Sequence, residues 1–476
     1  MAANNFASPL LARDAMEREI NAIESEFKMC FPDDNVRILQ ILMSNTADQS
    51  HVFNRFVWGN LKSLHGANPD TLWDDLKNFY DTYYSAERIR LVVQVKTEDN
   101  LEELTKWIQE SFSVIPNKSL GLQDFSQYTN SGKRESACTG KGPFEGVENR
   151  IVFVDSFQDL NKLFLMFSLP SDLKSAPKRS THLILQLFDH RGQGSLFACL
   201  KDLNWVLEIE TDPSDCLKTA FNMLSIEFEL TEAGLLNYKK VLALIFAYID
   251  RVRDEWLAAG EALPLFEEMK TISNLSYNVY TVPDQCENTC ALSQAMIHCT
   301  KMDNIIRDVY EKTYIEEIDT EHVKSILSKM TYQNAIISLQ GNDLLSQVET
   351  EKFTETPISE VQKEPHFTAK YRFFEKPANL KESFADAEFD EAMAKISKPD
   401  KNRFVPEDIS TLVSTEDRMQ RNSTPDMIQL TEDGKMHLFH SLDHVYLKPS
   451  TYLSIVLRIR QPKQRRNESK KPVSFL

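Results

Sequence analysis

The chain has 476 residues, of which 42% are hydrophobic and 26% are charged, and its formal net charge is −17. This length and composition fit two or three soluble globular domains whose cores need no disulfides. The negative charge excludes a protein that holds nucleic acid by general electrostatic attraction, and it favours the attraction of basic peptides.

Cysteine usage and hydropathy indicate the compartment. Seven cysteines are an odd number and sparse for this length, which favours free thiols in a reducing environment. Residues 1–13 contain no basic segment followed by a long apolar run, and the longest apolar run, residues 241–249, is too short to cross a bilayer. The sequence therefore predicts a cytoplasmic protein without a membrane partner.

The N-terminal region predicts helix, strand and helix in alternation. Residues 12–30 predict an amphipathic helix that ends before Pro32. Its apolar stripe, at spacings of four and three, consists of Met16, Ile20, Ile23 and Phe27. Further helices are expected over residues 73–84 and 101–112, and residues 89–95 between them are rich in β-branched side chains, which predicts a strand.

The central region follows a polar stretch over residues 116–146 and alternates strands with helices. The predicted strands are residues 151–154, 163–169, 224–230 and 335–339. The predicted helices are residues 181–188, a segment that ends at Leu203, and a long helix over residues 231–256. This mixture predicts an α+β fold in which helices flank sheets.

Three groups of residues present metal-ligand side chains. Glu19 and Glu26 lie seven residues apart and therefore share one helical stripe, although carboxylates on a helix are usually solvated surface groups. The segment HSLDH at residues 440–444 copies the spacing H-x-x-E-H, but that motif functions on a helix and the surrounding residues favour strands. A metal site that uses His437, His440 and His444 stays open as an alternative.

The third group, and the glycine clusters, have simple structural interpretations. Its residues are Cys286, Cys290, His298 and Cys299, all expected on one helix. Core thiols explain them better than structural zinc does, because zinc sites usually take ligands from turns and separate elements. Glycines at 140, 142 and 146 precede a strand and so do not form a phosphate loop. Residues 192–195 (GQGS) join two helices, which predicts a tight turn whose backbone closely approaches a neighbour or ligand.

Six stretches in one consistent order carry a family resemblance over nearly the whole chain. They are residues 13–26 (RDAMEREINAIESE), 53–60 (FNRFVWGN), 79–85 (FYDTYYS), 190–196 (HRGQGSL), 230–234 (LTEAG) and 402–406 (NRFVP). Together they resemble the insulysin/nardilysin branch of the pitrilysin family of zinc metallopeptidases, the inverzincins. Each stretch is weak evidence alone, and their shared order makes the resemblance specific.

The resemblance implies a zinc site of which this chain holds a small part. In the family, two histidines of H-x-x-E-H and a downstream glutamate bind zinc, and the glutamate of the motif activates water. Glu26 matches the downstream ligand and Glu19 matches the carboxylate that supports it. None of the ten histidines belongs to an H-x-x-E-H motif. One carboxylate does not hold zinc tightly, so no catalytic residue and no tightly bound zinc are expected in this chain.

The resemblance also implies a place where a peptide substrate binds as an added strand. The matching positions are His190, Gly192 and Gly194 in the turn and Leu207 and Glu208 on the following strand. Two departures change this region: residues 205–210 contain no glycine pair, and an arginine stands at 191 where family members often have glutamate. The expected ligand is a peptide, and a basic one if the nardilysin preference applies.

The resemblance implies one complete and two partial domains from a clam-shell enzyme. The expected order is the C-terminal part of the first, catalytic-type domain in residues 1–122, the complete second domain in 123–375, a linker in 376–430 and the start of a third domain in 431–476. The predicted strand over residues 453–459 would leave an exposed edge if nothing followed, so a third domain is expected to continue beyond it. The chain is therefore interpreted as a segment of a zinc metalloendopeptidase, or alternatively as a non-catalytic homologue that binds peptides or proteins.

Overall fold

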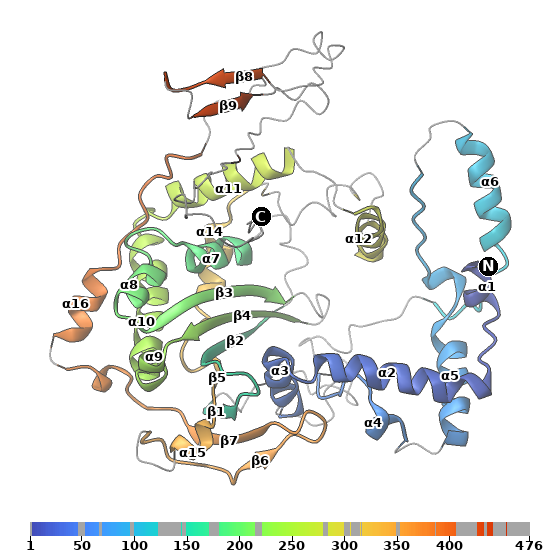
Figure 1. Ribbon diagram of the computed structural model, residues 1–476, viewed down its shortest axis with the longest axis horizontal. Helices are drawn as coiled ribbons and strands as arrows, with labels where there is room; N and C mark the ends of the chain where they lie inside the picture. The colour runs from blue at the N-terminus through green and yellow to red at the C-terminus, as the bar shows by residue number, and fades with distance from the viewer. Residues whose placement is uncertain are drawn as a thin grey trace, which may run out of the picture. The chain divides into compact units, whose positions relative to one another are not determined.

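The computed structural model (Figure 1) divides into two units, Met1–Val405 and Pro406–Leu476, which are described separately. It describes residues 2–45, 53–65, 69–95, 100–121, 144, 149–170, 180–214, 221–278, 284–298, 305, 315, 317–348, 353–385, 387–405, 426–432, 436–440 and 454. No helix in these ranges is long and apolar enough to cross a membrane.

A seven-stranded mixed sheet lies at the centre of the first unit, with the strand order β3-β4-β2-β5-β1-β7-β6. Its strands are β1 (Arg150–Asp155), β2 (Lys162–Pro170), β3 (Val206–Ser214), β4 (Phe221–Leu230), β5 (Ile336–Gly341), β6 (Gln362–Lys363) and β7 (Lys370–Glu375). Neighbouring strands are antiparallel except β1 and β5, which are parallel. The four strands expected in this region and the mixed helix–sheet class are confirmed.

Helices cover one face of the sheet. They include α7 (Ser180–Asp189), α8 (Leu196–Asp202), α9 (Glu232–Leu236), α10 (Tyr238–Arg251) and α14 (Thr320–Leu327). Alternate strand residues such as Phe153, Phe167 and Phe228 are fully buried in this layer, because successive side chains of a strand point to opposite faces. This layer contains the largest core of the described residues.

The long helix predicted over residues 231–256 is interrupted, so that part of the prediction is wrong. Asn237 separates α9 from α10, and a π-helix, η5 (Val252–Trp256), follows α10. The Asn237 side chain donates to the carbonyl oxygen of Ala233 at 2.8 Å. Asparagine competes with regular helix geometry by such bonds to the local backbone, which explains the break.

The opposite face is partly covered by a single helix, α3 (Asp34–Ser44), which lies beside the sheet (Figure 1). Asp33 caps its N-terminus by accepting hydrogen bonds from the N–H groups of Asn35 and Val36. Apolar residues of α3, including Ile38 and Ile41, pack against the β1, β5 and β7 part of this face. The sequence analysis assigned neither α3 nor the strands β6 and β7.

The N-terminal helices precede the sheet in the chain. They are α1 (Ala2–Ala7), η1 (Arg13–Ala15), α2 (Met16–Cys30), α4 (Leu61–His65), α5 (Pro69–Tyr83), η2 (Ala86–Arg88) and α6 (Leu101–Phe112). The three helices expected in this region are confirmed. Residues 89–95 are not a strand, because no described residue pairs with them, and Leu91, Val93 and Val95 are exposed. A strand requires hydrogen bonds to a neighbour, so an alternating sequence alone does not make one.

The remaining elements of the first unit include α11 (Leu263–Asn278), α12 (Gln285–His298), α15 (Leu344–Val348), η7 (Lys381–Ser383) and α16 (Glu388–Ala394). In the second unit the described strands β8 (Asp426–Gln429) and β9 (His437–His440) form an antiparallel hairpin. The strands expected over residues 444–447 and 453–459 lie outside the described residues, apart from 454. The predicted domain boundaries stay a prediction.

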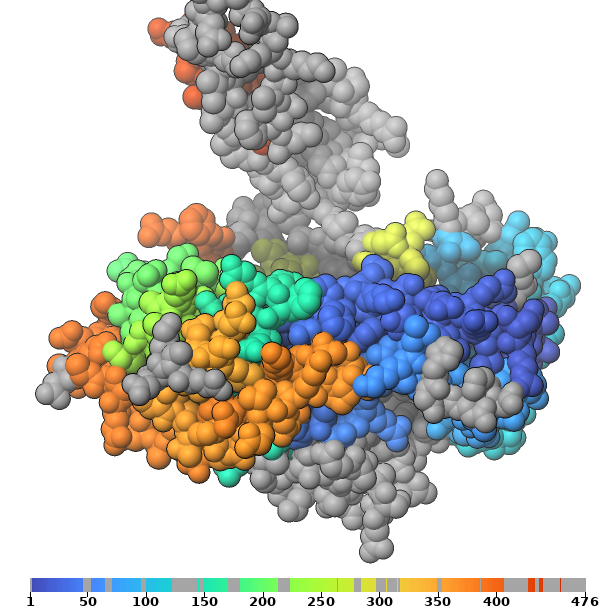
Figure 2. Space-filling model, turned by 60° about the horizontal axis from the view of Figure 1, so that its bottom comes forward, coloured from blue at the N-terminus to red at the C-terminus, as the bar shows by residue number. Residues whose placement is uncertain are grey.

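Arg37 of α3 connects the N-terminal helices to the sheet. Its side chain is only 5% exposed, and its guanidinium donates to the carbonyl oxygens of Phe367 at 2.9 Å and Phe31 at 3.3 Å. It forms an ion pair with Asp34 at 3.3 Å. Asp34 in turn accepts hydrogen bonds from the N–H groups of Phe157 and Gln158. Figure 2 shows the blue N-terminal residues directly against the orange residues around β6 and β7.

We expect the Arg37→Met substitution to lower the free energy of unfolding by about 3 kcal/mol, because it leaves the buried Asp34 carboxylate without its cation. Lys106→Met is the matched control, since its ion pair with Glu110 is exposed and 3.9 Å long. The control should change stability by less than about 0.5 kcal/mol. Urea unfolding followed by circular dichroism measures both, and equal midpoints would contradict the role of Arg37.

Candidate functional site

The turn between α7 and α8 confirms the expected close approach of its backbone to a neighbour. Gly194 has a φ of +81°, and a Cβ atom there would lie 2.2 Å from the Oγ atom of Ser397. The N–H of Ser397 donates to the Gly194 carbonyl oxygen at 2.9 Å. Ser195 then caps α8 by accepting from the N–H of Ala198 at 3.0 Å. The neighbour of this turn is therefore the segment that follows α16.

His190 packs inside the same turn. A Cβ atom on Gly192 would lie 2.6 Å from the Cε1 atom of the His190 ring, so the glycine makes room for the imidazole. The Nδ1 atom of His190 is buried and has no hydrogen-bond partner among the described residues. Burial lowers the pKa of His190, and the nearby Glu268 carboxylate opposes this shift. The imidazole is therefore neutral at pH 7, with its Nδ1 atom closed off from solvent.

Strand β3 forms one edge of the sheet, and no described strand pairs with its outer side. The register with β4 shifts between Val206 and Glu208, and the intervening Leu207 is 49% exposed. The side chain of Ile209 is buried in the core beneath the helices. Leu207 and Glu208, both expected to bind peptide, therefore lie at an open edge with a bulge.

Arg191 and Glu208 occupy the main-chain groups of Ile209. The N–H of Ile209 donates to the Oε1 atom of Glu208 at 3.1 Å, and its carbonyl oxygen accepts from the Nη2 atom of Arg191 at 2.5 Å. Arg191 and Glu208 form an ion pair of 2.6 Å with each other. The guanidinium also lies 4.4 Å from the centre of the Phe197 ring. The turn and the edge strand are joined by this pair.

Carboxylates face one another across β3 and β4. Glu208 is opposite Glu229 in the register, and Glu210 is opposite Glu227. Directly opposed like charges destabilise a sheet. Burial raises the pKa of Glu227, the ion pair with Lys162 opposes that shift, and the charges of Glu210 and Glu229 add to it. This part of the sheet therefore has an excess of negative charge that one lysine balances incompletely.

The residues matched to the family zinc site do not form a metal site by themselves. Glu19 and Glu26 are exposed on α2. No three histidine, cysteine, aspartate or glutamate side chains within the described ranges are grouped so that they could hold a metal ion. Because zinc sites take three or four protein ligands, the described residues do not fit this metal and no reaction step is derived through it.

The two other metal-ligand groups do not gain support. His437 and His440 lie three residues apart on β9, so their side chains point to opposite faces of the hairpin, and His444 lies outside the described residues. Cys286 and Cys290 lie on α12 and are exposed, so the expectation of core thiols is wrong. Their helix buries few of its described side chains, and apolar periodicity therefore does not direct these thiols inward.

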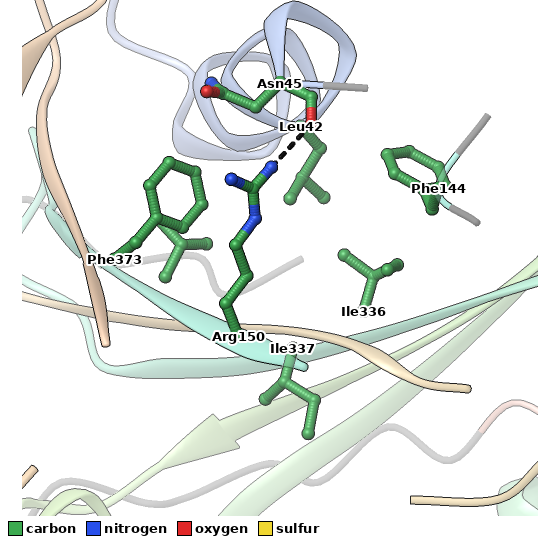
Figure 3. A pocket seen from close by; sticks show the side chains of 8 residues that line it. Leu42, Asn45, Phe144, Arg150, Ile336, Ile337 and Phe373 are labelled. Atoms are coloured by element: carbon green, nitrogen blue, oxygen red, sulfur yellow. Dashed lines mark hydrogen bonds between the residues drawn. The ribbon is translucent and has the colours of Figure 1, made fainter. Parts of the chain in front are cut away.

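A pocket lies between α3 and the sheet (Figure 3), and its empty space, counted out to solvent, is about 270 Å³. The guanidinium of Arg150 donates to the carbonyl oxygen of Asn45 at 2.7 Å and lies 4.0 Å from the centre of the Phe373 ring. Asn45 ends α3, where a cation is favoured by the helix dipole. Burial lowers the pKa of Arg150. Arg150 therefore has a structural role here, as a tie between the end of α3 and the sheet.

Sequence reasoning missed the residues that shape the edge. Arg191 was expected only to change the charge near the turn, and its bonds to Ile209 and Glu208 were not predicted. Glu210 and its neighbours on β4 were not singled out either. The one signal was the departure at 191, where family members often have glutamate, because a cation two residues from a buried helix end needs nearby acceptors.

Two family models match most of the chain. The model described as the peptidase M16 inactive domain matches residues 73–261. The model described as the middle or third domain of peptidase M16 matches residues 281–470. The two matches follow one another without overlap.

Similar proteins and structures agree with these matches. The chain is 26% identical to a nardilysin-like protein of Arabidopsis thaliana over 95% of its own length and 41% of that protein. It is 28% identical to nardilysin of Rattus norvegicus over 60% of its own length and 24% of that protein. The crystal structure of pitrilysin superposes with a TM-score of 0.67 at 21% identity, over 90% of this chain and 41% of that one. The chain thus spans less than half of each, and the fold is pitrilysin-like.

We expect Gly194→Ala to lower the free energy of unfolding by about 2 kcal/mol or more, because it adds a collision with Ser397 to the strain of a left-handed backbone. Gly121→Ala separates the two effects, since Gly121 has a φ of +70° and no atom within 4 Å of the added Cβ. That control should cost about 1 kcal/mol. Equal losses in thermal or urea unfolding would show that the contact with Ser397 is unimportant.

Proposed function

Because this chain belongs to the M16 peptidase family, we propose that it is a peptide-binding segment of an M16-type zinc metalloendopeptidase. By itself the segment binds extended peptides and does not hydrolyse them. The open outer edge of β3 is the observation that carries this proposal. An extended peptide adds to such an edge as a further strand, and its main chain supplies the affinity.

The charges around the edge support a basic peptide as the ligand. Glu208 and Glu210 lie on β3 opposite Glu229 and Glu227, and a peptide strand beside β3 would run next to the first two. Lysine or arginine side chains on that peptide would reduce the repulsion between these carboxylates. The formal net charge of −17 adds long-range attraction for a basic ligand.

The absence of catalysis in this chain follows from its set of side chains. Cleavage in the zinc peptidases needs two imidazoles and a general base around one metal ion. The sequence contains no H-x-x-E-H motif, and Glu26 is the single position that matches a zinc ligand of the family. Zinc would belong to an assembled site in which Glu26 is one ligand and Glu19 supports it.

A non-catalytic homologue that binds peptides or proteins is the second candidate. The same β3 edge would then act without any metal site, and the absent motif favours this alternative. The two candidates differ in one observation, which is whether the zinc motif is encoded in the same polypeptide. We place the protein in the cytoplasm without nucleic-acid or membrane partners, on the basis of its charge and its cysteine usage.

We expect a labelled peptide of alternating lysine and valine to bind, with fluorescence anisotropy as the measurement. A peptide N-methylated at the residues whose N–H groups face β3 should bind at least about tenfold more weakly, since it loses main-chain hydrogen bonds to the edge. Methylation at the alternate residues is the matched control and should change the affinity little. Equal losses for the two methylated peptides would contradict strand addition.

Glu210→Lys tests the charge preference on the protein. We expect it to weaken binding of the lysine peptide about tenfold, because it replaces an attractive charge beside the ligand by a repulsive one. Glu110→Lys, on the exposed side of α6, is the control for a change in net charge alone. A similar effect of both substitutions would show that the edge does not select basic side chains.

The isolated chain should not cleave a fluorogenic basic peptide, with or without added zinc, because it lacks the two imidazoles and the general base. Hydrolysis is followed by fluorescence with a chelator as the control. Cleavage that the chelator stops would contradict this part of the proposal.

A further inference from the structure

The outer main-chain groups of Ile209 are bound as if a strand were already beside them. In an antiparallel pair, a residue with outward N–H and C=O groups receives one acceptor and one donor from its neighbour. At Ile209 the carboxylate of Glu208 supplies the acceptor and the guanidinium of Arg191 supplies the donor, at 3.1 Å and 2.5 Å. The ion pair between Arg191 and Glu208 holds both in place.

We propose that the Arg191–Glu208 pair is an internal plug of the β3 edge, which an incoming peptide must displace. This inference rests on the proposed function, since it concerns regulation and specificity of the same edge. The plug occupies the hydrogen bonds that a peptide residue opposite Ile209 would make. Affinity for peptides is therefore set by a competition between the plug and the ligand main chain.

The plug is built so that it can open. The side chains of Arg191 and Glu208 are 38% and 46% exposed, and exposed ion pairs are weak. The Arg191 guanidinium has other contacts that remain when it leaves Ile209, namely the Phe197 ring and the carbonyl oxygen of Phe188 at 3.2 Å. Displacement therefore costs little, because the cation keeps other partners on the protein.

The identity of the plug predicts which peptides open it. Residues on either side of the one opposite Ile209 present their side chains on the face that carries Glu208 and Glu210, because side chains alternate along strands. A lysine or arginine at these two positions replaces Arg191 as the partner of Glu208. A glutamate there leaves Glu208 paired with Arg191 and keeps the plug closed. The edge thus selects extended peptides with basic residues on both sides of a central residue.

The test compares Arg191→Met with the wild-type chain, using the labelled lysine–valine peptide and anisotropy. The methionine keeps an apolar stem against Phe197 but has no N–H to donate to Ile209. We expect it to bind the peptide about tenfold more tightly than the wild type. Lys201→Met is the matched control, because Lys201 lies 5.1 Å from the same ring and makes no printed contact with β3. The control should change affinity less than about twofold, as expected for the loss of one positive charge.

Hydrogen exchange supplies a second readout that does not depend on the variant. Exchange of the β3 segment should be faster in Arg191→Met than in the wild type, and slower in both once peptide is added. A variant that binds no better than Lys201→Met, or an unchanged exchange rate of β3, overturns the plug. If the wild type itself binds the two N-methylated peptides equally, strand addition fails, and the plug fails with it. If the wild type distinguishes those peptides while Arg191→Met behaves like the control, only the plug is wrong.

Discussion

Arg37 is a charged side chain in the interior, and the arrangement of the first unit depends on its being satisfied. Removal of a guanidinium from water is costly unless acceptors replace the water, and here two carbonyl oxygens and the Asp34 carboxylate do so. These acceptors come from α3 and from segments far apart in the chain. The bonds fix α3 against the β1, β5 and β7 part of the sheet, so the β3 and β4 part of that face lacks this cover.

The uncovered part of the sheet ends in an edge, and edges have to be protected from unwanted pairing. Proteins use short strands and charged residues for this purpose. One edge of this sheet is the two-residue strand β6, whereas the other is β3, which carries Glu208, Glu210 and the contact with Arg191. Charges that repel most strands are the same charges that a basic strand satisfies. Protection and selective binding at β3 therefore come from one set of side chains.

The opposed glutamates across β3 and β4 contribute nothing favourable to the folded chain alone. A sequence selected for stability would place opposite charges in that register, and departures of this kind are expected at functional sites. Burial of Glu227 increases the energetic consequence, since its pKa is already raised. A cationic ligand is the simplest means of offsetting this charge, and it links the electrostatics of the edge to the peptide chemistry of the M16 family.

The sequence determined the local elements and the limits of the chemistry. Periodicity located α2 and the strand over residues 224–230, and the ordered stretches identified the family without a zinc motif. The turn at residues 190–196 was also predictable, because glycine and a capping serine act on their own neighbours. The tertiary structure alone decided that β7 lies in a polar region, that Arg191 reaches Ile209, and that residues 89–95 have no described partner strand. These features depend on which distant segments meet and in which register, and no local pattern encodes that choice.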